Sequence, residues 1–174
     1  MLAVMANSEH LNHDNVAARA GVSRRTVYRR FPDQSALRTG LWKLLSPGRG
    51  MPRSLEDLLE GMAEIFAGFD ARGDEMTVAM ASPEGRAMRN LLTPERVAAF
   101  RAAFADSAAG LPEPDRTWAI AAMQLMASGF AWREMRDQWG MDATAITTAS
   151  RWAIKAMLAD LKRRGNKPLA DGAA

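Results

Sequence analysis

The segment that most constrains the fold of this chain is residues 16–32, which read VAARAGVSRRTVYRRFP. Gly21 is predicted to end one helix, because glycine accepts the left-handed conformation that closes a helix. Ser23 is a favourable N-cap for a second helix. Pro32 limits that second helix, since the residue before a proline avoids helical angles. The segment therefore predicts two short helices joined by a three-residue turn.

The same segment concentrates positive charge. It contains five arginines and no acidic residue. Residues 1–45 hold seven Lys or Arg and three Asp or Glu, a net charge of +4, whereas the whole chain of 174 residues has a net charge of +3. The positive excess therefore lies in the first quarter of the chain, which favours a polyanionic partner. A solvated basic face without a partner is the alternative interpretation.

A family resemblance rests on residues spread over this region. The matching residues are Val16-Ala17, Arg19-Ala20-Gly21-Val22-Ser23, Thr26-Val27-Tyr28, Phe31-Pro32 and Leu37. With these residues, positions 11–45 resemble the DNA-binding domain of TetR/AcrR-type transcriptional regulators. The resemblance implies a sequence-specific DNA-binding transcriptional regulator, in the form of a ligand-responsive homodimeric repressor. Its expected partners are a double-stranded DNA operator, a small-molecule effector of apolar character and a second copy of the chain.

The resemblance also implies which residues contact DNA. The start of the second helix would reach base edges, and Arg24 and Arg25 are the candidates for pairing with guanine. Residues further along would hold phosphates, and Asn12 would cap the first helix near another phosphate. Tyr28 is alternatively a packing residue with its hydroxyl at the surface. The predicted DNA-binding residues are Asn12, Ser23, Arg24, Arg25, Thr26, Tyr28, Arg29 and Arg30, and the predicted core residues beside them are Val16, Ala20, Val22, Val27, Phe31 and Leu37.

The rest of the chain has helical periodicity and no strand-like alternation, so we expect an all-α fold. We expect an N-terminal helix-turn-helix head (1–45), a helical bundle body for effector binding and dimerisation (46–164) and a disordered tail (165–174). Helix breakers in residues 46–52 mark the linker between head and body. Before the motif, either the first helix is short, over about residues 2–8, or the chain continues upstream of Met1. Further helices are predicted over residues 35–45, 54–71, 74–81, 84–92, 94–109, 116–139 and 143–164, with Gly140 separating the last two and Asp142 capping the last.

Apolar residues of the body suit two functions. Side chains at helical spacing in the last two predicted helices would form a dimer interface, and large adaptable side chains would line an effector pocket. Packing within one chain explains both sets as well, because every buried helix face needs an apolar stripe. The dimer candidates are Leu125, Gly129, Trp132, Trp152, Ala153 and Met157, and the ligand-binding candidates are Phe66, Met80, Phe104, Trp118, Met123 and Met126.

Enzymatic chemistry is not expected. His10 and His13 are the two histidines, and the chain has no cysteine that could complete a metal site with them. We therefore expect no catalytic residue, no metal and no cofactor. No apolar run reaches membrane-spanning length, and the first residues lack the pattern of a signal peptide, so we expect a cytoplasmic protein.

A second functional class stays open beside the regulator. It is a helical ligand- or protein-binding module with a degenerate DNA-binding head. Two features support it, namely the short first helix and Gln34, which stands where the resembled family often has a phosphate-contacting lysine.

Overall fold

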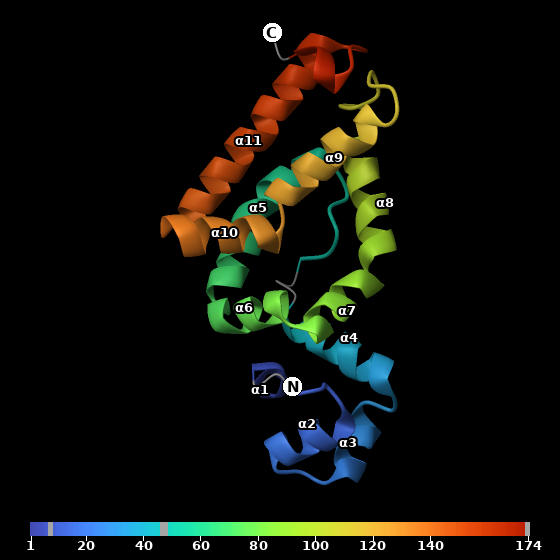
Figure 1. Ribbon diagram of the computed structural model, residues 1–174, viewed down its shortest axis with the longest axis vertical. Coiled ribbons are helices and arrows are strands. Elements are labelled where there is room, and N and C mark those ends of the chain that lie inside the picture. The colour runs from blue at the N-terminus through green and yellow to red at the C-terminus, as the bar shows by residue number, and fades with distance from the viewer. Residues whose placement is uncertain (7–8, 46–48, 173–174) are drawn as a thin grey trace. The chain divides into compact units, whose positions relative to one another are not determined.

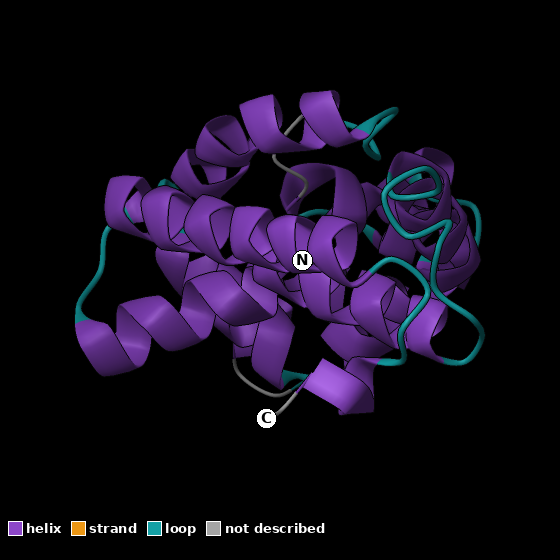
Figure 2. Ribbon diagram, turned by 90° about the horizontal axis from the view of Figure 1, so that it is seen from above, coloured by secondary structure: helices purple, strands orange, loops and turns teal. Residues whose placement is uncertain are grey.

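The computed structural model describes residues 1–6, 9–45 and 49–172. Every regular element in this part of the chain is a helix, eleven α-helices and one 3-10 helix, so the predicted all-α class is confirmed (Figure 2). The contacts between these helices form two compact units. The first unit comprises residues 1–48 and 71–93, and the second unit comprises residues 49–70 and 94–174.

The first unit is built from two stretches of the chain. In it α2 packs against α3, α4 against α7, and α6 against α7, while α1 lies against α6 and α2 (Figure 1). Its helices are α1 (Leu2–Ala6), α2 (His13–Ala20), α3 (Arg24–Arg30), α4 (Gln34–Leu45), α6 (Gly73–Ala81) and α7 (Pro83–Leu91).

The first helix, α1, has five residues. A helix of five residues has almost no stability by itself, because nucleation is costly and the gain comes from packing. Val4 and Met5 supply that packing, since both are almost completely buried. The buried side chains of α6 and α7 continue this core, among them Met76, Met80 and Met88. The predicted ligand-binding residue Met80 thus belongs to the first unit.

The second unit gathers around α11, which packs against α5, α9 and α10 (Figure 1). Its core contains the fully buried side chains of Phe66, Phe104, Met123, Trp132 and Ile154. Its helices are α5 (Leu55–Asp70), α8 (Thr93–Ala103, which begins at the last residue of the first unit), α9 (Asp115–Met126), α10 (Gly129–Trp139), α11 (Ala143–Arg164) and the 3-10 helix η1 (Leu169–Gly172).

One predicted helix, over residues 116–139, is wrong, because the chain forms two helices there. The break lies at Ala127 and Ser128. Ser128 has an extended backbone, and its Oγ accepts hydrogen bonds from the N–H groups of Phe130 and Ala131 at 3.2 and 3.3 Å. The serine therefore competes with helix continuation and caps α10 instead.

The structure also differs from the predicted bounds of one further helix and adds a short helix near the C-terminus. The predicted helix 94–109 ends at Ala103. After Gly165, where a disordered tail is expected, the described residues include η1, and the N–H of Leu169 donates to the carboxylate of Asp115 at 2.5 Å. Residues 46–48 of the predicted linker and residues 173–174 of the tail lie outside the described residues.

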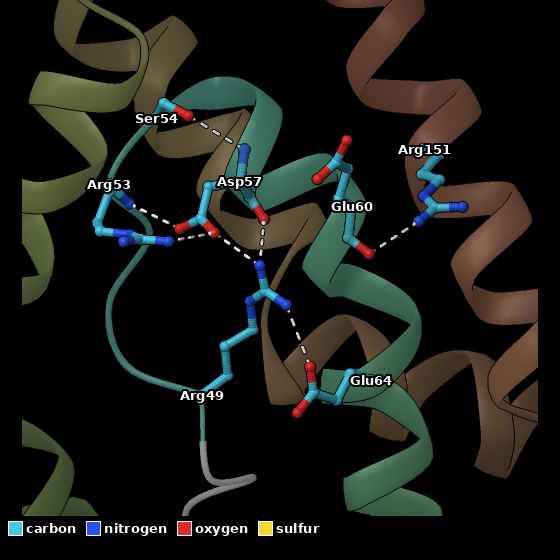
Figure 3. Close-up of polar contacts among 7 residues, drawn as sticks. All are labelled: Arg49, Arg53, Ser54, Asp57, Glu60, Glu64 and Arg151. Atoms are coloured by element: carbon cyan, nitrogen blue, oxygen red, sulfur yellow. Dashed lines mark hydrogen bonds and ion pairs between the residues drawn. The ribbon is translucent and has the colours of Figure 1, made fainter.

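A charged cluster fixes the beginning of the second unit (Figure 3). Arg49 pairs with Asp57 at 2.6 Å and with Glu64 at 3.1 Å. The Asp57 carboxylate also accepts from the backbone N–H of Arg53 at 3.0 Å. The hydrogen bonds from Arg53 and Arg49 lower the pKa of Asp57 from 3.8 to about 2. Gly61 leaves room for the arginine, since an added Cβ would lie 2.5 Å from Arg49 Nε.

On a neighbouring turn of α5, Arg151 of α11 reaches the helix backbone (Figure 3). Its Nε donates to the carbonyl oxygen of Leu59 at 2.7 Å, and its terminal nitrogen donates to that of Glu60 at 3.2 Å. These contacts are to backbone oxygens and therefore join α11 to α5 irrespective of the side chains at those two positions.

Candidate nucleic-acid interface

The first helix of the candidate interface, α2, has a capping residue at each end. The Asn12 side chain accepts from the N–H of Asn15 at 2.8 Å and caps the helix, as predicted. Gly21 has φ +64°, and the next N–H, that of Val22, donates to the carbonyl of Ala17 at 3.1 Å. This is the left-handed helix end that glycine favours, so the predicted role of Gly21 is confirmed.

Helix α3 follows after a three-residue turn. The Ser23 hydroxyl accepts from the N–H of Thr26 at 3.2 Å, which confirms the predicted N-cap. Val27 is buried and holds α3 against the core of the first unit. Phe31 packs on Gly40 of α4 so closely that an added Cβ there would overlap the ring. The two apolar residues thus fix one side of α3.

The opposite side of α3 is exposed and basic. Arg25, Arg29 and Arg30 are all exposed, and no hydrogen bond or ion pair joins their side chains to any described residue. Residues 25 and 29 are four apart and project from the same face of the helix. Arg25 and Arg29 on this face, with Arg30 at the end of the helix, make a surface that suits the phosphates and base edges of a nucleic acid.

Arg24 is held differently from the other three. Its Nε lies 2.9 Å from an oxygen of Asp14, and a terminal nitrogen donates to the Tyr28 hydroxyl at 3.4 Å. Its guanidinium carbon also lies 5.4 Å from the centre of the Tyr28 ring. The hydrogen bond with Tyr28 and the charge of Asp14 raise the pKa of Arg24, so this arginine stays charged but has partners already.

Tyr28 contacts a second ring that the sequence interpretation did not assign to the interface. The rings of His13 and Tyr28 are stacked, with centroids 3.9 Å apart and planes 3° from parallel. His13 is only 7% exposed, and its Nε2 donates to the carbonyl oxygen of Phe31 at 2.7 Å. The sequence contains a signal for the burial of His13, because His13, Val16 and Ala17 have the i, i+3, i+4 spacing of residues on one side of a helix.

Two predicted core residues of this region are wrong. Ala20 and Val22 are exposed, whereas Val16, Val27 and Leu37 are buried and Phe31 is half-buried. Ala20 is the last residue of α2 and Val22 lies in the turn, so both stand at the outer edge of the first unit.

The six ligand-binding candidates do not gather in one unit. Met80 belongs to the first unit and the other five to the second. Phe66, Phe104 and Met123 are fully buried and Met126 is half-buried, whereas Trp118 is exposed. A shallow depression of the second unit is lined by α11 residues instead, which are Thr148, Arg151, Trp152, Lys155 and Ala156.

The six dimer candidates differ in how far they are buried. Trp132 is fully buried in the second unit, where its indole N–H donates to Asp70 at 2.6 Å. Its side chain is therefore part of the core of one chain and is not open to a partner. Leu125 and Trp152 are exposed, Trp152 to 72%. The remaining candidates, Gly129, Ala153 and Met157, are half-buried.

Over residues 1–6, 9–45 and 49–172, no group of three or more His, Cys, Asp or Glu side chains is placed to hold a metal ion. None of the helices described there is both long and apolar enough to cross a membrane. Comparison with known proteins adds no identification, since no protein-family model, no curated protein and no solved structure matches this chain.

Proposed function

We propose that this protein is a sequence-specific DNA-binding transcriptional regulator whose recognition helix is α3. The observation that carries the proposal is the exposed basic surface of α3, where Arg25, Arg29 and Arg30 have no partner among the described residues. Val27 fixes the other side of the helix in the core. A short helix anchored on one side and basic on the other suits insertion into the major groove.

The arginines take different roles in this proposal. Arg25 lies near the start of α3, where side chains reach base edges, and its guanidinium can pair with the two acceptor atoms of guanine. Arg29 and Arg30 lie at the end of the helix and neutralise phosphates, together with the hydroxyls of Thr26 and Tyr28. Arg24 contacts DNA only after its ion pair with Asp14 is broken.

The regulator is proposed to act as a homodimeric repressor that an effector releases from DNA. Proteins with this kind of motif read two half-sites about one helical turn apart, which requires two copies of α3. The exposed side chains of Leu125 and Trp152 offer apolar surface for association. An effector would shift the dimer only by binding one arrangement more tightly than another. A cytoplasmic location is part of the same proposal.

The proposal is tested first by capturing genomic DNA fragments on the purified protein and sequencing those that are retained. The expected result is a small set of enriched sites with two related half-sites. Binding to such a site is then titrated at several salt concentrations, where each phosphate contact adds about −0.9 to the slope of log K against log salt. Retention of fragments without any common sequence would contradict specific recognition.

The assigned base-reading role has its own matched pair of variants. Arg25→Ala is expected to weaken binding to the selected site about tenfold or more, and binding to unrelated DNA much less. Arg163→Ala, at the exposed end of α11, removes the same charge from the second unit and is the control. Equal losses on selected and unrelated DNA would remove Arg25 from the base-reading role.

One observation favours a second candidate, the helical ligand- or protein-binding module with a degenerate head. The Gln34 side chain donates to the carbonyl of Leu11, so that amide holds α4 to the segment before α2 and is not free for a phosphate. A folded protein that binds no genomic fragment at low salt would favour this candidate over the regulator.

A further inference from the structure

The stacked pair of His13 and Tyr28 has a geometry that simple packing does not require. A buried histidine needs one partner for its ring N–H, and the carbonyl of Phe31 already satisfies Nε2 at 2.7 Å. The parallel alignment with Tyr28 is a separate feature, with 3.9 Å between centroids. Tyr28 itself is 38% exposed, so the contact lies at the edge of the core.

His13 and Asp14 are neighbours on α2, and each of them contacts one residue of α3. His13 stacks on Tyr28, and Asp14 pairs with Arg24 at 2.9 Å. Arg24 and Tyr28 are four residues apart on α3 and also contact each other. The phenol ring therefore has an aromatic contact with His13 and a cationic contact with Arg24, both of which restrict its rotation.

We propose that His13 is a positioning residue, which holds the Tyr28 phenol in the orientation that binds a phosphate of the DNA backbone. This inference rests on the proposed function. A side chain that is ordered before binding loses less conformational entropy when the complex forms. Burial in the first unit confines the histidine ring, and the stack with this confined ring restricts the rotation of Tyr28.

The composition of the chain makes the proposal directly measurable. Tyr28 is the single tyrosine among 174 residues, so nitration by tetranitromethane reports on this ring alone. His13→Gln keeps an amide donor for the Phe31 carbonyl and removes the stacked ring. His13→Phe keeps a ring that can stack and removes the donor. His10→Gln changes the exposed second histidine, which pairs with Glu84, and is the control.

The expected results separate the stack from the hydrogen bond. In the free protein, His13→Gln nitrates at Tyr28 several times faster than wild type, whereas His13→Phe and His10→Gln nitrate at the wild-type rate. On the selected DNA site, His13→Gln binds about three- to tenfold more weakly, which is the size of one lost neutral contact. His13→Phe restores most of this loss.

A double-mutant cycle with Tyr28→Phe shows whether His13 acts through the hydroxyl. If it does, His13→Gln causes no further loss in the Tyr28→Phe protein. A purely structural histidine gives additive losses and an unchanged nitration rate, and either outcome overturns the proposal. Loss of binding in His13→Phe equal to that in His13→Gln overturns it as well.

Failure of this inference can be told from failure of the proposed function. A wild-type protein that binds no DNA overturns the regulator and this inference together. A wild-type protein that binds a specific site, with His13→Gln unchanged in affinity, overturns the role of His13 alone. Far-UV circular dichroism of every variant verifies that the fold is retained before binding is compared.

Discussion

Replacing Asp70 by alanine should destabilise the second unit strongly, although the residue lies at the exposed end of α5. Its carboxylate accepts two hydrogen bonds from different helices. One comes from the indole N–H of Trp132 in α10 at 2.6 Å, and the other from the backbone N–H of Ala143, the first residue of α11, at 2.7 Å. The Asp70 side chain thus joins the end of α5 to α10 and to the start of α11.

The magnitude follows from what each donor loses. Trp132 is fully buried, so its indole N–H finds no water in the native state and is left unpaired, which costs about 1–3 kcal/mol. The N–H of Ala143 lies in the first turn of α11, where losing an anionic acceptor costs about 0.5–1 kcal/mol. Together these give about 1.5–4 kcal/mol, a substantial fraction of the roughly 5–15 kcal/mol that is typical of a whole domain.

The assay is urea unfolding followed by far-UV circular dichroism at one fixed protein concentration. Asp70→Asn keeps one acceptor oxygen and should lose about half as much stability as Asp70→Ala, roughly 1–2 kcal/mol. Asp106→Ala removes an exposed carboxylate elsewhere in the second unit and should stay within about 0.5 kcal/mol of wild type.

A cycle with Trp132→Phe tests the pairing itself. Because the phenylalanine has no N–H, Asp70→Ala should cost at least about 1 kcal/mol less in the Trp132→Phe protein than in wild type. Strict additivity of the two substitutions, or an Asp70→Ala protein as stable as Asp106→Ala, would refute the reasoning.

Three further predictions concern both units. Asp14→Asn releases Arg24 and should tighten DNA binding at low salt about two- to fivefold, with a steeper salt dependence in an anisotropy titration; weaker binding would contradict this. Gly85→Ala places a methyl group on the carbonyl oxygen of Ala79 and should cost about 2 kcal/mol or more in urea unfolding, and a wild-type midpoint would show that the close approach is relieved cheaply. Asp57 has its pKa lowered to about 2, below the 3.8 of a free aspartate, so its stabilisation is present at neutral pH and is lost as the pH falls from 3.8 through about 2. The urea midpoint of Asp57→Asn should therefore depend less on pH in that window than the wild-type midpoint does.

Helix ends were predictable from the sequence because their chemistry is local. Gly21 and Gly140 both adopt the left-handed conformation, with φ +64° and +63°, and Asp142 caps α11 through the N–H of Ala145. Each of these residues acts on backbone groups within a few positions of itself. The break at Ser128 is equally local, but the apolar spacing on both sides of it continues a helical period and conceals it.

Packing partners were not predictable, because an apolar stripe does not specify what covers it. Trp132 and Trp152 satisfy the same helical spacing, yet one is fully buried and the other is 72% exposed. Trp132 meets residues that lie far away in the sequence, namely Phe69, whose ring centroid lies 5.6 Å from that of the indole, and Asp70, which receives the indole N–H. No pattern within α10 or α11 contains that information.

In the candidate interface, the exposed charges were predictable and the contact between the two helices was not. The exposed arginines follow from charge, since a guanidinium without a partner stays in water. The contact between His13 and Tyr28 depends on how α2 crosses α3, and residue spacing along one helix does not determine a crossing.

The composition of the first unit links the recognition helix to residues that the sequence assigns to the body. Val4, Met5, Met76 and Met88 are buried within this one unit, although more than 70 residues separate the two pairs. A five-residue α1 has little stability of its own, so its order depends on the packing of α6 against it. Because α1 also packs on α2, which holds α3 through His13 and Asp14, a displacement of α6 would alter the support of the basic face directly. Under the proposed function, an effector that moves α6 or α7 would therefore change DNA affinity within a single folded unit, without requiring the second unit to transmit the change.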